Sequence, residues 1–336
     1  MRAAVLVDTG RIEMQERPVP QPGPGDVLIR VSSVGVCGSD THYYREGRIG
    51  DFVVSAPLIL GHEAAGAIAA VGQGVPDELV GQRVSIEPQR PDPGSDETRR
   101  GNYHLCPHMQ FFATPPVDGA LCEYVTIGSA FAHPVPDAIS DDAAALCEPL
   151  SVGIAAIGKA AVTGGASVLI AGAGPIGILA AQVARAFGAT EIIVTDLDPR
   201  RRDLATRFGA TSALDPRVDD PAELKVDAFV DASGAPSAVA SGLAAVRPAG
   251  RAVLVGMGGP TIELPVQVIQ NRELTLTGVF RYANTWPTAI ALISSGRVEL
   301  DAMVTARYPL DKTADALESD RVPGNIKSIV EVGTAV

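Results

Sequence analysis

The stretch Ser167-Val-Leu-Ile-Ala-Gly-Ala-Gly-Pro-Ile-Gly177 decides the fold class, because a continuous apolar run leads directly into three spaced glycines. The apolar run predicts a buried strand, and Pro175 to Phe187 predicts a helix. In such a strand–turn–helix, Gly172 permits the tight turn, Gly174 lets the backbone approach a pyrophosphate, and Gly177 lets the helix pack closely on the strand. This context favours a dinucleotide-binding loop over a purely structural glycine turn.

The chain on the C-terminal side of this loop keeps alternating between strand and helix signals. Further strands are expected at Glu191 to Thr195, Asp227 to Asp231 and Ala252 to Gly256. Strands that alternate with helices form a parallel sheet with helices on both faces. The sequence therefore predicts a doubly wound α/β domain that begins near Leu150.

Asp196 ends the strand after the glycine loop, 24 residues beyond Gly172. A carboxylate at this place accepts hydrogen bonds from the adenosine ribose and repels a 2′-phosphate, which favours NAD over NADP. Arg200 and Arg201 follow closely, and an arginine there can hold a 2′-phosphate. Instead of binding a phosphate, these arginines could form ion pairs with a neighbouring aspartate, Asp198 or Asp203.

The N-terminal part of the chain, up to about residue 150, is rich in short strand signals separated by turns. Val27 to Val31, Ala65 to Val71 and Arg83 to Ile86 are strand candidates, and residues 88 to 103 have the polar composition of a loop. After about Val279 the pattern becomes mixed again, as if the chain returned to the first domain. We therefore expect a β-rich unit here.

Bulk composition excludes several classes of function. The 336 residues are enough for two domains, and the net charge of −12 argues against a nucleic-acid partner. No run of 18 apolar residues predicts a membrane helix, so no membrane partner is expected. The cysteines at 37, 106, 122 and 147 form no Cys-x-x-Cys pair. Without a secretion signal, they are expected to be reduced thiols in a cytoplasm.

Cys37, His62, Glu63 and Glu148 offer a thiolate, an imidazole and two carboxylates, the donor types that bind zinc. A catalytic zinc needs three protein ligands and one open position. Taken singly, Cys37 could instead be a small buried apolar residue, and His62 could instead be a core histidine whose nitrogens are hydrogen-bonded. Glu148 lies in an apolar run, where a carboxylate is costly unless it is paired or bound to metal. A metal that polarises an alcohol, next to a cofactor that takes hydride, would unite both halves of the chain.

Six blocks of sequence carry a resemblance to a known family: Gly35-Val-Cys-Gly-Ser-Asp-Thr-His-Tyr43, Gly47-Arg-Ile-Gly-Asp-Phe52, Leu60-Gly-His-Glu63, Ala113-Thr-Pro-Pro116, Glu148-Pro-Leu-Ser-Val-Gly153 and Val279-Phe-Arg-Tyr-Ala-Asn-Thr-Trp286. Together they resemble the sorbitol (polyol) dehydrogenases among the zinc-dependent medium-chain alcohol dehydrogenases. The resemblance implies a GroES-like β-rich catalytic domain at 1–149 and 279–336. It also implies a Rossmann NAD-binding domain at 150–278.

The resemblance also implies roles for individual residues. Catalytic zinc would be held by Cys37, His62 and Glu63, with Glu63 acting directly or through water, and Glu148 would ligate zinc or contact substrate. The catalytic positions would be Ser39, His42 and Glu148, with Ser39 and His42 as a proton relay. The substrate contacts would be Tyr43, Glu148, Arg281 and Tyr282. The NAD contacts would be Gly172, Gly174, Ile176, Gly177, Asp196, Arg201, Val255, Gly256, Met257, Val279, Phe280 and Arg281.

One departure from the family concerns a second, structural zinc that many relatives hold on four cysteines. The aligned positions here are Asp92, Ser95, Thr98 and Cys106, with a single thiol. We therefore expect one catalytic zinc per chain and no structural zinc. A homotetramer is expected, with a dimer as the alternative.

The sequence thus predicts reversible, NAD-linked oxidation of a secondary hydroxyl of a polyol, such as sorbitol or xylitol, to a ketose. Three alternatives stay open at this point. A related zinc dehydrogenase would act on threonine, a butanediol or a cyclitol. A zinc-free quinone or enone reductase would not need Cys37 and His62. A non-catalytic nucleotide-binding protein would show no turnover.

Overall fold

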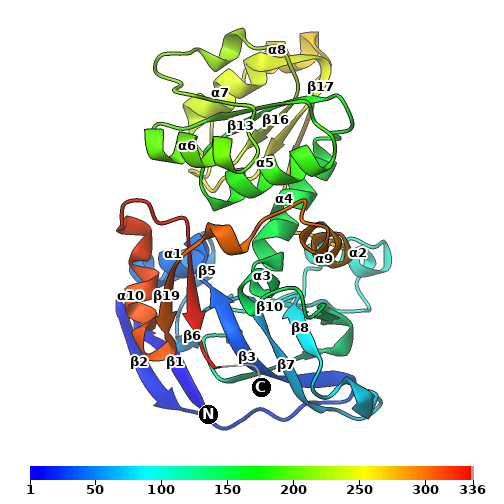
Figure 1. The fold of residues 1–336 in the computed structure, drawn as a ribbon, viewed down its shortest axis with the longest axis vertical. Helices are drawn as coiled ribbons and strands as arrows, with labels where there is room; N and C mark the ends of the chain where they lie inside the picture. Colours follow the sequence, from blue (N-terminus) through cyan, green and yellow to red (C-terminus); the bar gives the residue numbers. More distant parts are fainter. Residues whose placement is uncertain (334–336) are drawn as a thin grey trace. The chain divides into compact units, whose positions relative to one another are not determined.

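The computed structural model describes residues 1–333, which divide into two compact units. The first unit comprises Met1–Glu148, Trp286–Ser294 and the chain from Leu300 onward, and the second comprises Pro149–Thr285 and Ser295–Glu299. In Figure 1 the blue N-terminal strands and the red C-terminal strand belong to the same unit. The first unit is therefore built from both ends of the chain.

The first unit is rich in β-structure. Its main sheet has seven strands in the order β12-β8-β7-β3-β20-β19, with β11 also paired to β3. The strands of this unit are β1 Arg2–Asp8, β2 Arg11–Glu16, β3 Asp26–Gly35, β4 Arg48–Ile49, β5 Phe52–Val53, β6 Leu58–Ile59, β7 Glu63–Val71, β8 Arg83–Ile86, β9 Gln89–Arg90, β10 Gln110–Phe111, β11 Tyr124–Gly128, β12 Ala132–Pro134, β19 Val304–Pro309 and β20 Lys327–Glu331. Its helices are α1 Gly38–Glu46, α2 Asp96–Arg99, α3 Asp141–Ala145, α9 Trp286–Ser294 and α10 Thr313–Leu317. Its 3-10 turns are η1 Asp77–Leu79, η2 Tyr103–Leu105, η3 Ser129–Phe131, η5 Asp301–Met303, η6 Leu310–Lys312 and η7 Ser319–Arg321.

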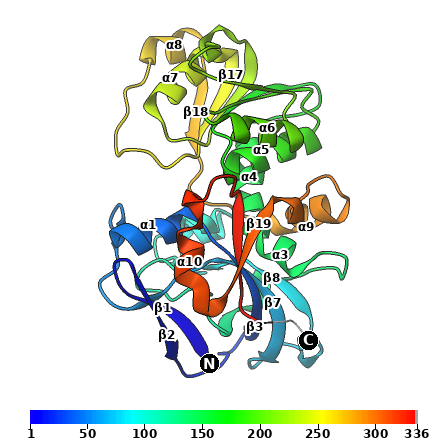
Figure 2. The same ribbon diagram turned by 60° about the vertical axis from the view of Figure 1, so that its left-hand side comes forward.

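Strand β3 is central to this sheet and is apolar over most of its length, because β7 and β20 flank it and its side chains enter the core. The pairing register sets which strand ends meet. Gly35, the last residue of β3, lies opposite Glu63, the first residue of β7, and opposite Ile329 of β20. The end of β3 and the starts of β7 and β20 therefore lie close together at one end of these strands. Strands β3 and β7 are labelled in Figure 2.

The second unit contains a parallel sheet of six strands in the order β15-β14-β13-β16-β17-β18. Its strands are β13 Ser167–Ala171, β14 Glu191–Thr195, β15 Ser212–Leu214, β16 Val226–Asp231, β17 Val246–Leu254 and β18 Thr275–Gly278. Its helices are α5 Pro175–Ala186, α6 Pro199–Arg207, α7 Pro236–Ala245 and α8 Val266–Asn271, and its 3-10 turn is η4 Pro221–Glu223. Helix α4, Cys147–Lys159, begins in the first unit and continues into this one.

The helices of the second unit cover both faces of its sheet. Figure 1 shows α5 and α6 on one side of β13 and β16, with α7 and α8 on the other. The strand order reverses between β13 and β16, which is the arrangement of a doubly wound sheet. The predicted fold class, a β-rich GroES-like unit with a doubly wound dinucleotide-binding unit, is confirmed.

Within residues 1–333, no helix combines the length and the apolar character needed to cross a membrane. The four cysteines are free thiols, with Cys106, Cys122 and Cys147 buried and Cys37 half-buried.

Candidate metal centre and dinucleotide site

Three of the predicted zinc ligands lie together in the first unit. Cys37, His62 and Glu63 each offer one ligand atom, and these three atoms lie within 4.8 Å of one another. The ligands of a tetrahedral zinc are about 3.3–3.8 Å apart, given metal–ligand bonds of about 2.0–2.3 Å. The cluster therefore closes around a zinc ion with small side-chain movements. Glu148 does not belong to this three-residue group.

The strand ends explain why residues so distant in sequence meet. Cys37 follows the end of β3 and caps the N-terminus of α1, while His62 immediately precedes β7, which begins at Glu63. Because Gly35 pairs with Glu63, the turn after β3 and the start of β7 are neighbours. The sheet register therefore brings the thiol, the imidazole and the carboxylate to one place.

Asp40, which the sequence reading did not single out, orients two of the ligands. Its Oδ2 accepts a hydrogen bond from the backbone N–H of Cys37 at 3.1 Å, and its Oδ1 accepts one from that of Gly61 at 2.9 Å. The same Oδ1 lies 3.5 Å from Nδ1 of His62. A carboxylate at Nδ1 holds the imidazole in the tautomer that leaves Nε2 free for a metal.

The electrostatics of this cluster favour a cation. Burial on its own lowers the pKa of His62, but the negative charges of Asp40 and Cys37 outweigh it and hold that pKa well above its usual range. Burial raises the pKa of Asp40, and His62 with the two backbone N–H groups reverses the effect and lowers it. Asp40 is therefore ionised, and the pocket stabilises positive charge at the imidazole, where a metal ion would bind.

Glu63 is fully buried, and its two oxygens have different surroundings. Oε1 accepts a hydrogen bond from Nζ of Lys327 at 2.5 Å, in an ion pair whose side chains are 0% and 5% exposed. Oε2 is buried and has no hydrogen-bond partner among the described residues. A buried carboxylate oxygen without a partner is costly, so Oε2 fits a metal ligand. With Cys37 and His62 it gives three protein ligands, the number that a catalytic zinc takes.

Lys327 was also missed by the sequence reading. It is the first residue of β20 and lies 264 residues from Glu63 in the chain. Burial lowers the pKa of its ammonium group, but the negative charges of Glu63 and Cys37 more than compensate and raise it. The only sequence signal is a lysine at the start of Lys327-Ser-Ile-Val-Glu331, a segment of mixed polarity that is also typical of a surface strand.

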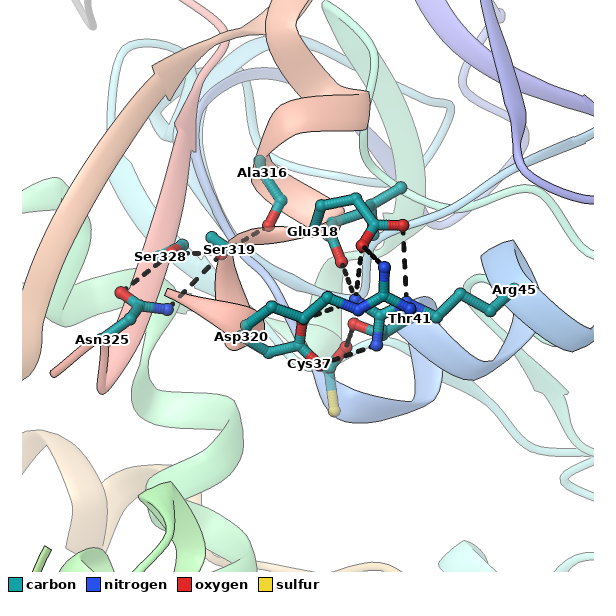
Figure 3. Close-up of polar contacts among 11 residues, drawn as sticks. Cys37, Thr41, Arg45, Ala316, Glu318, Ser319, Asp320, Asn325 and Ser328 are labelled. Atoms are coloured by element: carbon teal, nitrogen blue, oxygen red, sulfur yellow. Dashed lines mark hydrogen bonds and ion pairs between the residues drawn. The ribbon is translucent and has the colours of Figure 1, made fainter. Parts of the chain in front are cut away.

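Helix α1, which carries Cys37 at its N-terminus, is fixed at its other end to the C-terminal part of the chain (Figure 3). Arg45 forms ion pairs with Glu318 at 2.9 Å and with Asp320 at 2.6 Å. At the N-terminus, the Thr41 hydroxyl donates to the backbone carbonyl of Cys37 at 3.3 Å. The C-terminal end of α1 is thus tied to the C-terminal part of the chain, whereas the Thr41 bond lies within the helix and its N-cap.

The predicted catalytic and substrate residues of α1 differ in exposure. Ser39 is half-buried, and Tyr43 is buried. His42 lies on the exposed face of the helix, with Nδ1 3.3 Å from Glu46. Glu148 is 5% exposed and lies in the first turn of α4. In the second unit, Tyr282 is buried, and the guanidinium of Arg281 lies 4.5 Å from the centre of the Phe280 ring.

The second unit contains a cavity of about 600 Å³ next to the glycine loop. Four predicted cofactor residues line it: Gly172, Gly174, Asp196 and Arg201. Gly174 caps α5 without a side-chain hydrogen bond, so the first N–H groups of this helix are available to phosphates. A Cβ on Gly177 would lie 1.8 Å from the carbonyl oxygen of Gly172, which confines this position to glycine.

The other predicted cofactor residues follow the carboxyl ends of neighbouring strands. Ala171, Asp231, Leu254 and Gly278 lie in register across β13, β16, β17 and β18. Two predicted segments therefore leave the same edge of the sheet as the glycine loop: Val255 to Met257 after β17, and Val279 to Arg281 after β18. Ile176 and Gly177 are in the first turn of α5. Dinucleotides bind at this edge of doubly wound sheets.

Asp196 is held in the position that the sequence predicted for a ribose acceptor. Its Oδ2 accepts a hydrogen bond from the N–H of Ala173 in the glycine loop at 2.8 Å, and Oδ1 accepts one from the N–H of Asp198 at 2.9 Å. Arg200 pairs with Asp198 at 2.8 Å, which is the alternative weighed for it from the sequence. Arg201 lines the cavity together with Asp196, and Arg217, which is paired with Asp215, lines it as well.

The loop at the aligned structural-zinc positions is closed by hydrogen bonds. The N–H of Asp92 donates to Sγ of Cys106 at 3.3 Å, and the Ser95 hydroxyl donates to that of Thr98 at 2.9 Å. Burial raises the pKa of the Cys106 thiol, but hydrogen bonds from Ser95 and from the backbone of Asp92 more than offset it and lower that pKa.

Known proteins resemble this chain in both units. Residues 23–137 match the family described as "Alcohol dehydrogenase GroES-like domain", and residues 175–295 match "Zinc-binding dehydrogenase". Sorbitol dehydrogenase of Bacillus subtilis is 44% identical over 327 residues, which cover 95% of this chain and 93% of the relative. The crystal structure of L-idonate 5-dehydrogenase from Escherichia coli superposes with a TM-score of 0.93 at 31% identity and covers 98% of both chains. An alcohol dehydrogenase from Escherichia coli CFT073, solved with NADH, has a TM-score of 0.92 at 27% identity over 99% of both chains.

Fold, ligand cluster and matched families together define a zinc-binding, medium-chain alcohol dehydrogenase. Within that class the chain belongs to the sorbitol dehydrogenase family, given 44% identity over nearly its whole length. The family resemblance stated from the six sequence blocks is confirmed.

Proposed function

We propose that this protein catalyses the reversible oxidation of a secondary hydroxyl of a polyol to a ketose, with NAD as the hydride acceptor. The observation that carries the proposal is the cluster of Cys37, His62 and Glu63, in which a buried carboxylate oxygen has no hydrogen-bond partner among residues 1–333. The same chain contains a dinucleotide cavity. The named substrates of two relatives, sorbitol and idonate, are both polyhydroxylated compounds.

When bound at Cys37, His62 and Glu63, a zinc ion supplies Lewis acidity that lowers the pKa of a substrate hydroxyl. The protein's part is to fix these three ligands and to hold the imidazole through Asp40. We assign substrate binding to Glu148, which is buried and lies outside the three-ligand cluster.

The proton released from the substrate needs a path to solvent. Ser39 is half-buried and His42 is exposed on the same helix, three residues further along. Positions three apart lie on one face of a helix, so the two side chains are neighbours. We assign them to the inner and outer steps of this path. Tyr43, Arg281 and Tyr282 are assigned to the remaining hydroxyls of the polyol.

The preference for NAD rests on Asp196. Its carboxylate is fixed by two backbone N–H groups at the wall of the cavity, where a 2′-phosphate would meet its negative charge. Arg200 is engaged by Asp198, so only Arg201 of the arginine pair is directed to the cavity.

The number of zinc ions is proposed to be one per chain. The loop that holds four cysteines in many relatives retains Cys106 alone, and hydrogen bonds close it. Cys106→Ser should leave zinc content and activity nearly intact. Two equivalents of zinc in well-washed wild-type protein would contradict this proposal.

We also propose a cytoplasmic homotetramer. The four free thiols suit a reducing compartment. Strand β18 ends the six-stranded sheet within the described chain, and Phe280, which follows it, has a side chain that is 62% exposed. An open sheet edge beside exposed apolar side chains favours contact with another copy. Sedimentation at several concentrations would distinguish a tetramer from a dimer or a monomer.

The decisive experiment combines metal analysis with a substrate screen. Purified protein should contain one zinc, and it should reduce NAD with sorbitol, xylitol, ribitol or galactitol faster than with threonine, 2,3-butanediol or a cyclitol. Removing zinc with a chelator should abolish turnover, and re-adding it should restore turnover. Faster turnover of threonine or butanediol would overturn the polyol assignment, and turnover without metal would overturn the zinc chemistry.

A further inference from the structure

The two oxygens of Glu63 are held in unequal positions by a residue from the far end of the chain. Lys327 donates to Oε1 at 2.5 Å, while Oε2 has no partner among residues 1–333. Both side chains are almost wholly buried, so water does not compete for either charge. The carboxylate therefore presents one free oxygen to the metal ligand cluster.

Lys327 is fixed in this position by a second contact. Its Nζ also donates to the backbone carbonyl of Val36 at 2.8 Å, and the Val36 N–H donates to the carbonyl of Ser328 at 2.9 Å. The lysine is thus tied to the turn that leads into Cys37. Moving the ammonium group away from Glu63 would leave a buried charge without its counter-charge, which is strongly unfavourable.

We infer that Lys327 is a positioning residue that restricts Glu63 to a single metal–oxygen bond. This inference rests on the zinc site proposed above. Carboxylates bind metals through one oxygen or through two. With Oε1 held by Lys327, Glu63 fills one coordination position, and the fourth position stays open for the substrate oxygen. Without Lys327, Oε1 is free to take that position.

Lys327 has a second effect on the same site, through charge. The ammonium group of Lys327 offsets part of the negative charge that Cys37, Glu63 and Glu148 bring to this site, and so favours a further negative charge there. A hydroxyl that loses its proton at this site is stabilised by that charge. The hold on Oε1 and the effect of charge both require a lysine at the start of β20, where this strand pairs with β3.

The test uses the full-length protein with cobalt(II) in place of zinc, because the visible bands of cobalt weaken when its coordination number rises from four to five. Wild-type protein should give the intense bands of a four-coordinate ion. Lys327→Met should lose band intensity. The double variant Lys327→Met/Glu63→Gln should regain it, since a glutamine offers only one oxygen to the metal.

Two further variants separate positioning from general stability. Lys327→Gln keeps a neutral N–H donor for Oε1 and should retain the four-coordinate spectrum, which keeps the inference testable if Lys327→Met does not fold. Arg45→Met breaks the ion pairs that hold α1 without touching Glu63, so it should lower the melting temperature and leave the spectrum unchanged. NAD binding should be unchanged in all variants.

The outcomes distinguish this inference from the function on which it rests. Equal cobalt spectra for wild type and Lys327→Met, or a weakened spectrum for Lys327→Gln, would overturn the role of Lys327 and leave the zinc site standing. If wild-type protein and Cys37→Ser gave the same cobalt spectrum, the proposed zinc site would be wrong, and the inference about Lys327 would be wrong with it.

Discussion

Gly35 allows a sharp test of whether Glu63 is a metal ligand. This residue ends β3 opposite Glu63, and its backbone lies outside the left-handed region, so alanine is permitted by conformation. A Cβ at this position would nevertheless lie 2.0 Å from Oε2 of Glu63, the oxygen without a hydrogen-bond partner in the described part of the chain. The substitution Gly35→Ala therefore acts on the Glu63 side chain by contact, most strongly on Oε2, with Cβ and Cδ at 3.1 Å.

The expected magnitude follows from this distance. Carbon–oxygen contacts shorter than 3.0 Å are essentially never seen, so Oε2 must move by about 1 Å. Metal–ligand distances tolerate changes of only about 0.2 Å. Lys327 holds the other oxygen, so the carboxylate cannot simply rotate to restore the bond. The loss should exceed that of an outer-shell partner, which is about 10- to 100-fold in metal affinity, or about 1.4–2.7 kcal/mol.

The assay is competition for zinc with a coloured chelator, below the melting temperature of the metal-free variant. Gly38→Ala is the matched control, since Gly38 follows Cys37 directly and a Cβ there meets nothing within 4 Å. It should leave zinc affinity unchanged and stabilise α1 by up to about 1 kcal/mol. Equal zinc affinity in Gly35→Ala and wild type would refute the argument that Glu63 is a direct ligand.

Three further predictions concern the cofactor, the substrate and the pH dependence of the site. Wild type should show at least about tenfold higher kcat/KM with NAD than with NADP, equal to about 1.4 kcal/mol, and Asp196→Ala should narrow that ratio in steady-state assays. Arg281→Ala should cost about 2 kcal/mol in kcat/KM for polyols and much less for a simple secondary alcohol, and equal losses would show that the arginine serves the cofactor or the structure. Burial lowers the pKa of His62, but Asp40 and Cys37 hold it well above its usual range in the metal-free protein. Zinc must displace that proton, so chelator competition at pH 6, 7 and 8 should show zinc affinity falling as pH falls, by about tenfold per pH unit for each proton displaced.

The dinucleotide unit could be predicted in detail because its signals are local. The strand, the glycine turn and the helix occupy 21 consecutive residues from Ser167 to Phe187, and Asp196 ends the next strand. Each of these features depends on neighbours along the chain: apolar continuity, backbone freedom at glycine and an open helix N-terminus. The structure accordingly has β13, α5 and β14 where the sequence places them.

The metal centre was predictable as a set of donor types, and the tertiary structure shows which of the candidate donors lie together. Sequence alone left Glu63 and Glu148 as alternative ligands. Pairing of Gly35 with Glu63 brings the latter to Cys37 and His62, and Glu148 stays outside the group. A ligand set of this kind depends on strand register, which is fixed by long-range packing.

By itself the sequence determined the fold class, the glycine loop, the donor types of the metal site and the family to which they belong. Only the tertiary structure revealed the partners that hold the donors in place. Lys327 meets Glu63 across 264 residues because β20 pairs with β3, and its burial follows from that pairing. The local sequence around Lys327 does not show whether this lysine faces solvent or a buried carboxylate. Its role is set by its surroundings in three dimensions, which the local pattern does not contain.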